Sequence, residues 1–234
     1  MDDNDFMDDM SSMKSLSTKP CVKPQPVSKV GKSEQTRAAI LNAALDFVWS
    51  HPFRDMTVGQ LMAKTGLSRA AFYQYYGDLH ELMEALLGLI EGEILAAAEP
   101  WFTRTGDPVA LLRESLTGLV EVSYRQGPIL RAADEAAPND KRLEKGWAQF
   151  LGRFDEAVAA RIEADQKQGL IAKFDARPVA VALNRLDAYT LIDAFGRRPR
   201  RKREPVLQAL ERIWTSSLYG SQWIGQENSD LTRN

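Results

Sequence analysis

The stretch that decides the fold is residues 57–76, TVGQLMAKTGLSRAAFYQYY. Thr57 can cap a first helix, because its side chain can accept a hydrogen bond from the backbone N–H of Gln60 while the Gln60 side chain bonds back. Apolar residues then recur with the 3.6-residue period of a helix. Gly66 permits the left-handed turn that ends this helix, and Ser68 can cap a second one. The pattern predicts two short helices joined by a tight turn.

The second short helix has the features of a helix that reads DNA. Phe72 falls on its inner side, and Arg69, Ala70 and Tyr73 fall on the outer side. Arginine can bond guanine or a phosphate, an alanine methyl group can contact thymine, and a tyrosine hydroxyl can bond a phosphate. We therefore expect a helix-turn-helix. A helical hairpin inside an ordinary bundle has the same spacing and stays open as the alternative at this point.

Composition limits the class of protein. A chain of 234 residues can form one or two domains and bury a sizeable core. It has no apolar run of eighteen residues, and its first ten residues are acidic rather than signal-like, so we expect a cytoplasmic protein with no membrane partner. Cys21 is the single cysteine, and two histidines alone do not make a usual zinc site. We expect no metal, no cofactor and, without G-x-S-x-G, phosphate-loop or zinc spacing, no enzyme activity.

The charge distribution is unusual for a DNA-binding protein. The net charge is −2 and the pI about 5.8, and residues 33–80 are nearly neutral. Lysines are concentrated in residues 14–32, inside a polar, proline-containing segment that we expect to be disordered. This basic segment either follows DNA as an arm or is a solvated tail. Binding must therefore depend on well-placed contacts rather than on bulk charge.

Every other segment has helical periodicity, so the predicted fold is all-α. We expect a first helix capped by Ser33, a fourth one capped by Asp78 and ended by Pro100, and a break at Gly127-Pro128. The further helices are expected at about 108–127, up to 137, 139–168, 176–195 and 204–219.

The helix predicted for residues 176–195 carries two polar residues, Asn184 and Asp187, on an apolar face. A polar group buried without a partner costs about 1–3 kcal/mol, so both side chains need hydrogen bonds. The partners are either a neighbouring helix or a ligand in a mostly apolar pocket. The opposite side of this helix is also apolar, which a second subunit would explain.

The string at residues 57–76, followed by a long all-helical remainder, resembles the TetR family of transcriptional regulators. This resemblance covers about residues 33–98. Two further strings, ALNRLDAYT at 182–190 and RIWTSSLYG at 212–220, resemble the EthR-like branch, whose ligand domain holds lipophilic molecules in a hydrophobic tunnel.

The resemblance implies roles for particular residues. The DNA contacts would be Arg69, Ala70 and Tyr73, with Thr57, Ser68 and Tyr75 near phosphates. The tunnel would be lined by Leu112, Leu119, Trp147, Phe154, Asn184 and Trp214, with Asp187 in place of an amide of that branch. Candidates for the dimer interface are Ile213, Ser217 and Leu218. Leu79 stands where the family usually has a lysine that contacts phosphate, and His80 beside it is a partial replacement.

The sequence therefore predicts a disordered arm at 1–32, a three-helix DNA-binding domain at 33–80, a ligand-binding and dimerisation domain at 81–222, and a flexible tail at 223–234. We expect the basic loop at 197–203 to be solvated and remote from the DNA-binding part. The expected function is a homodimeric repressor that binds a double-stranded DNA operator and is released by a lipophilic small molecule. The alternatives are a ligand-dependent activator, a DNA-binding module without ligand sensing, and a helical interaction module without DNA.

Overall fold

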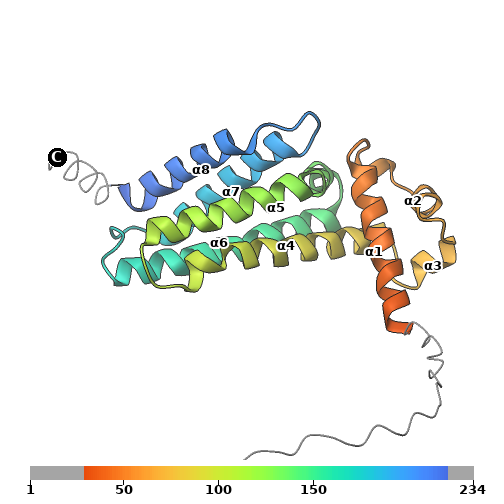
Figure 1. The fold of residues 1–234 in the computed structure, drawn as a ribbon, viewed down its shortest axis with the longest axis horizontal. Helices are drawn as coiled ribbons and strands as arrows, with labels where there is room; N and C mark the ends of the chain where they lie inside the picture. Colours follow the sequence, from red (N-terminus) through yellow and green to blue (C-terminus); the bar gives the residue numbers. More distant parts are fainter. Residues whose placement is uncertain (1–28, 221–234) are drawn as a thin grey trace, which may run out of the picture.

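The structure, a computed structural model, describes residues 29–220 as helices and connecting turns, with no strand in that range (Figure 1). Its α-helices are α1 (Lys29–Val48), α2 (Val58–Thr65), α3 (Arg69–Tyr73), α4 (Leu79–Thr103), α5 (Pro108–Ala136), α6 (Lys141–Lys167), α7 (Ala176–Phe195) and α8 (Arg203–Leu218), and its 3-10 helices are η1 (Phe53–Asp55) and η2 (Ala137–Asn139). The all-α prediction is confirmed. Most of the predicted arm and all of the predicted tail lie outside the described residues.

Two parts of different shape follow one another along the molecule. Helices α1, α2 and α3 form one end, and α4 to α8 lie side by side as a bundle (Figure 1). Helix α4 is separated from the end of α3 by five residues and runs along the bundle (Figure 1). The largest apolar cluster crosses the predicted boundary at residue 80, since it contains Phe72 and Leu82 as well as Ile129 and Leu143. The two ends therefore share one core.

The local signals in residues 57–76 are confirmed. The Gln60 N–H donates to Thr57 Oγ1 at 3.2 Å, and the Thr57 N–H donates to Gln60 Oε1 at 3.0 Å. Gly66 has a φ of 70°, and Ser68 Oγ accepts from the Ala71 N–H at 3.2 Å. Each short helix is thus bounded by the cap that its sequence predicts.

The start predicted for the first helix is wrong. Helix α1 begins at Lys29, four residues before Ser33, and the Thr36 hydroxyl donates to the Lys32 carbonyl within it. Residues 29–32 contain no proline, so their backbone can remain helical. The helix therefore extends past Ser33 toward the N-terminus, and Ser33 is not its cap.

The end predicted at Pro100 is also wrong, because α4 continues to Thr103 with Pro100 inside it. A proline cannot donate a backbone hydrogen bond and disturbs the preceding turn. Ser115 of α5 bonds the backbone on both sides of the proline: its hydroxyl accepts from the Trp101 N–H at 3.0 Å and donates to the Ala98 carbonyl at 3.2 Å. The neighbouring helix therefore compensates for the proline.

Helix α5 likewise runs through Gly127-Pro128 to Ala136, against the predicted break. Pro128 leaves the Tyr124 carbonyl without its usual helical donor. Arg200, from the loop before α8, donates to that carbonyl through Nη1 at 2.6 Å. A Cβ at position 127 would lie 2.7 Å from the Phe195 carbonyl, so Gly127 lets α5 and α7 approach closely. Tertiary contacts thus keep the helix continuous.

No helix in residues 29–220 is long and apolar enough to cross a lipid bilayer.

Candidate DNA-binding surface and ligand cavity

The predicted DNA contacts gather around the exposed side of α3. Phe72 is fully buried and fixes this helix to the core, while Arg69, Ala70 and Tyr73 are exposed, Tyr73 to 60%. Thr57 and Ser68 are also exposed, and each side chain is engaged in a helix cap. Tyr75 is half-buried. The structure therefore presents one surface that fits the groove-facing side of a recognition helix.

The Arg69 side chain lies across the first turn of α2. A Cβ at Gly59 would come within 2.6 Å of Arg69 Nη2, so the guanidinium occupies the space that a side chain at position 59 would need. The absence of a side chain at Gly59 thus contributes to the orientation of Arg69.

The start of α4 is fastened to the start of α6. Arg142 bonds Asp78 at 2.8 Å and Glu84 at 2.8 Å and 3.0 Å. His80 Nε2 lies 2.5 Å from a carboxylate oxygen of Asp140, the residue that caps α6. This hydrogen bond lowers the pKa of Asp140, and the Glu81 N–H bonded to Asp78 lowers the pKa of Asp78. The ring of His80, suggested as a partial replacement for a phosphate contact, is bonded to Asp140 of α6 in this structure.

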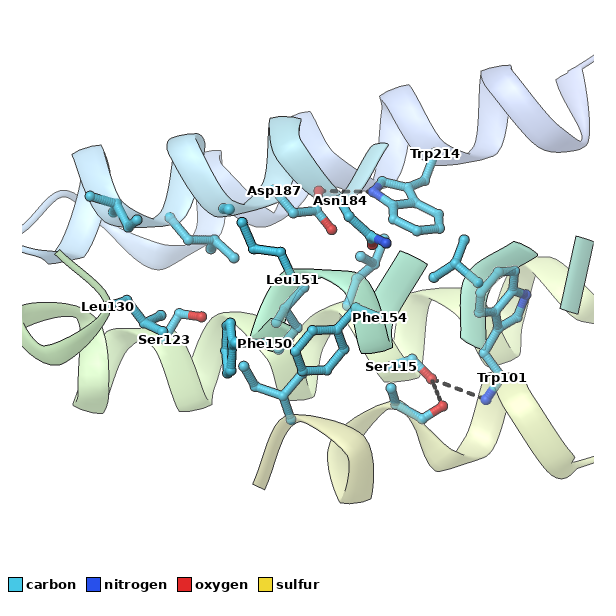
Figure 2. Close-up of a pocket in the computed structure, with 18 of the residues that line it drawn as sticks. Trp101, Ser115, Ser123, Leu130, Phe150, Leu151, Phe154, Asn184, Asp187 and Trp214 are labelled. Carbon is cyan, nitrogen blue, oxygen red and sulfur yellow. Dashed lines mark hydrogen bonds between the residues drawn. The ribbon is translucent and has the colours of Figure 1, made fainter. Parts of the chain in front are cut away.

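A cavity of about 90 Å³ lies inside the bundle between α4, α5, α6, α7 and α8 (Figure 2). All seven residues predicted for the ligand site line it: Leu112, Leu119, Trp147, Phe154, Asn184, Asp187 and Trp214. The lining is otherwise almost entirely apolar. An apolar wall with a few polar groups is typical of small-molecule binding sites.

The two polar residues of α7 both have partners inside the protein. The Asn184 side-chain nitrogen donates to Asp155 Oδ1 at 2.9 Å, and Trp214 Nε1 donates to Asp187 Oδ1 at 2.9 Å. Arg185 holds both oxygens of Asp155. The partners are therefore neighbouring helices, the first of the two sequence-based alternatives, and both side chains also line the cavity. Burial raises the pKa of Asp187 to about 7, and the Trp214 N–H acts in the opposite direction.

Ser123 is a cavity residue that the sequence reasoning missed. Its hydroxyl is fully buried and has no hydrogen-bond partner among the described residues. Ser123 follows Leu112, Leu116 and Leu119 at helical spacing, so extending that stripe by four positions would have found it. Trp101, Leu151 and Phe150 also line the cavity and were not predicted.

The predicted dimer residues do not share one orientation. Ser217 is exposed and Ile213 is half-buried, but Leu218 is 5% exposed and packs inside its own chain, so it is not available to a partner. Tyr189 on α7 is 61% exposed and was not predicted. Among the described residues of α7, Tyr189 is the large apolar side chain that is exposed to solvent.

The basic loop at 197–203 is exposed to solvent, as expected, except that Arg200 is half-buried. The expectation that it lies remote from the predicted DNA-binding part is wrong. The guanidinium carbons of Arg198 and Arg200 lie 4.6 Å and 5.3 Å from the centroid of the Trp49 ring, which directly follows α1. That of Arg200 also lies 3.7 Å from the centroid of Tyr124 in α5. The other arginines of this loop form ion pairs: Arg197 with Glu135, Arg201 with Asp193 and Arg203 with Glu121. The loop therefore joins α5 and α7 to the DNA-binding end.

Arg131 forms a buried junction beside this loop. Its guanidinium donates to the Gly196 carbonyl at 2.9 Å, to Glu135 at 2.9 Å and to the Val48 carbonyl at 2.5 Å. Gly196 follows the last residue of α7, and Val48 is the last residue of α1. One side chain thus connects the end of a cavity helix, α7, with the end of α1, which belongs to the predicted DNA-binding domain. Gly196 and Val48 are 65 and 83 positions away from Arg131 in the sequence, so no sequence pattern could have revealed this junction.

No group of three or more histidine, cysteine, aspartate or glutamate side chains within residues 29–220 is arranged to hold a metal ion.

Comparison with known proteins gives the following relatives. Residues 112–220 match the family described as "Transcriptional regulator EthR, C-terminal domain". The HTH-type transcriptional regulator EthR of Mycobacterium tuberculosis (strain H37Rv) is 28% identical over 189 residues, which cover 78% of this chain and 86% of that protein. A TetR-family regulator from Syntrophomonas wolfei superposes with a TM-score of 0.69 at 16% identity, covering 78% of this chain and 94% of the other. A SmeT–triclosan complex superposes with a TM-score of 0.68 at 17% identity, covering 80% and 93%. The similarity therefore extends over most of the chain.

Proposed function

Because this chain belongs to the TetR family of transcriptional regulators, with an EthR-type C-terminal domain, we propose that it is a homodimeric repressor released from its DNA operator by a lipophilic molecule. One observation carries the proposal: α4 is separated from the recognition helix by five residues of the chain and also forms a wall of the cavity. A change in the cavity therefore has a direct mechanical path to the DNA-binding end.

The size of the cavity supports a role for α4. Sites for small lipophilic molecules usually have volumes of about 300–1,000 Å³, whereas this cavity has about 90 Å³. A lipophilic ligand must therefore push the walls apart. Ile94, Ala98, Trp101 and Phe102 of α4 are part of the wall, so we infer that ligand binding displaces this helix. Structures of related fold accept small molecules, as the SmeT–triclosan complex shows for SmeT.

Displacement of α4 would act on DNA binding through the dimer. Two recognition helices must match half-sites about one DNA turn, or roughly 34–36 Å, apart. The exposed side of α7 with Tyr189, and the exposed Ser217 of α8, suit a twofold contact. Moving α4 in each subunit changes the spacing of the two α3 helices, so operator affinity falls without any change in the recognition residues.

The proposal is tested with the DNA immediately upstream of the chain's own gene in a gel-shift titration. Arg69→Ala should cost roughly 1–3 kcal/mol of specific binding, because it removes a base or phosphate contact. Arg104→Ala, at the far end of α4, is the matched control and should bind like the wild type. Equal affinity of the Arg69 and Arg104 variants would contradict the role of α3.

The ligand half of the proposal is tested on the same complex with n-octanol and n-octylamine, two lipophilic probes of equal chain length. At least one of them should raise the Tm of the protein and weaken its binding to DNA, because it binds the repressor more tightly than the operator complex. If neither probe has these effects, the chain is a DNA-binding module without this kind of sensing.

A further inference from the structure

We propose that the cavity selects lipophilic amines, whose ammonium group binds the free carboxylate oxygen of Asp187. This inference rests on the proposed function and adds the chemical class of the effector. Figure 2 shows Asp187 between α7 and the cavity, with one carboxylate oxygen bonded to Trp214 and the other directed away from it.

Most of the hydrogen-bond donors in the cavity wall already have acceptors. The indole N–H groups of Trp214 and Trp101 donate to Asp187 Oδ1 and to the Tyr219 hydroxyl. The Asn184 nitrogen donates to Asp155. No described residue donates a hydrogen bond to Asp187 Oδ2 or to Asn184 Oδ1. The Ser123 hydroxyl also has no partner, but it can donate as well as accept. Beside Asp187 and Asn184 the wall offers unfilled acceptors, so a ligand group that complements these two residues must be a donor.

The charge of Asp187 is not balanced inside the cavity. Asp187 is the one titratable residue among those that line the cavity from α4, α5, α6, α7 and α8. The neighbouring Arg185 is not its counter-ion, because both of its hydrogen-bonding nitrogens bind Asp155. A buried carboxylate without a cation is costly, and burial accordingly raises its pKa to about 7. An ammonium group would supply the missing positive charge.

Aromatic rings make up much of the cavity lining. Trp101, Trp147, Phe150, Phe154 and Trp214 all line the cavity. The Trp147 and Phe150 rings stack with centroids 5.2 Å apart, and Phe150 and Phe154 meet edge to face at 5.1 Å. Aromatic faces attract cations and also pack against alkyl chains. An amine with an apolar tail matches both properties, whereas a neutral alcohol of the same length matches only one.

The competing possibility is that Asp187 stays protonated and donates to a neutral ligand. The two possibilities differ in their response to pH. An alkylammonium titrates near pH 10, as lysine does, so between pH 6 and pH 8 only the carboxylate changes its charge in the cavity. Binding of an amine should strengthen over this range, and binding to a protonated Asp187 should weaken.

The experiment is a calorimetric titration of the full-length protein with n-octylamine and n-octanol at pH 6 and pH 8. At pH 8 the amine should bind about tenfold more tightly than the alcohol, because a charge-assisted hydrogen bond replaces a neutral one. The preference should shrink at pH 6. Asp187→Asn keeps the side-chain size and the acceptor for Trp214 and should remove the preference, while Asp193→Asn, an exposed change on the same helix, should keep it.

The outcomes separate the two levels of the proposal. If both probes bind equally well, or if the alcohol binds more tightly, the amine inference is overturned and a lipophilic effector remains. A preference that survives in Asp187→Asn would also overturn it. If neither probe binds to the wild type, the ligand half of the proposed function fails as well. The pH series on the wild type needs no variant, so the inference can be rejected even if Asp187→Asn does not fold.

Discussion

Asp187 combines a structural and a binding role at the scale of one residue. Its carboxylate is buried, accepts one hydrogen bond from Trp214 and has no counter-ion among the residues that line the cavity. In the folded protein the neutral form is therefore favoured, and the pKa rises from 3.8 to about 7. The residue that shapes ligand choice should thus also make stability depend on pH.

The sign of this dependence follows from the raised pKa. The folded chain holds the proton more tightly than the unfolded chain, so the stabilisation by protonation is complete below about pH 4 and is lost as pH rises through about 7. At about 1.4 kcal/mol for each pKa unit, the ionised carboxylate costs on the order of 4 kcal/mol. Asp187→Asn should therefore become increasingly more stable than the wild type between pH 4 and pH 8 in urea unfolding. If the free energies of unfolding of the two proteins changed in parallel with pH, the pKa of the Asp187 carboxylate would not be raised.

At the scale of elements, two helices continue through prolines, and side chains of neighbouring elements bond the backbone around each proline. Ser115 bonds the turn after Pro100, and Arg200 bonds the Tyr124 carbonyl that Pro128 leaves free. In isolation both segments carry a signal to end the helix. The continuity of α4 and α5 is therefore a property of the bundle, and it depends on particular side chains of other elements.

Arg200→Ala tests this dependence on α5. The substitution removes the hydrogen bond to the Tyr124 carbonyl and the stacking on the Tyr124 ring, so the free energy of unfolding should fall by about 1–3 kcal/mol. Arg201→Ala, the next residue, removes an exposed ion pair with Asp193 and should change it by less than about 0.5 kcal/mol. The free energy of unfolding of each variant is measured by urea denaturation, with circular dichroism as the signal. Equal effects would mean that α5 does not rely on Arg200.

At the scale of the whole molecule, the DNA-binding end and the bundle meet at more than one place. Helix α4 is bonded to α6 through Arg142 and His80, and Arg131 bonds the ends of α1 and α7. The first connection lies where α4 begins, and the second lies where a cavity helix ends. We propose that a ligand-induced shift of the bundle reaches α1 through Arg131 as well as through α4.

Arg131→Lys tests the second connection. Lysine keeps the charge but lacks the planar fork that bonds Gly196, Glu135 and Val48 together. The variant should bind operator and n-octylamine, but the loss of operator affinity caused by the probe should be at least about fivefold smaller than in the wild type. Arg125→Lys, an exposed residue of α5 paired with Glu93, is the control and should respond like the wild type. An unchanged response of Arg131→Lys would leave α4 as the sufficient path.

The sequence by itself determined the features that depend on neighbouring residues. Thr57, Ser68 and Asp78 cap their helices as predicted, and helical spacing alone placed Asn184 and Asp187 on the buried face of α7. Resemblance to a family added the positions of Leu112 and Trp214, which lie far apart in the chain and line one cavity. Their role in ligand binding stays a prediction.

Only the tertiary structure decided which distant groups meet. It paired Asp187 with Trp214, 27 positions away, and left the second oxygen of Asp187 to the cavity. It also turned the basic loop toward Trp49 and carried two helices through their prolines. Caps and periodicity act within one or two turns, so they can be read from the sequence. Hydrogen bonds between separate helices depend on how the helices pack, which no local pattern of this sequence specifies.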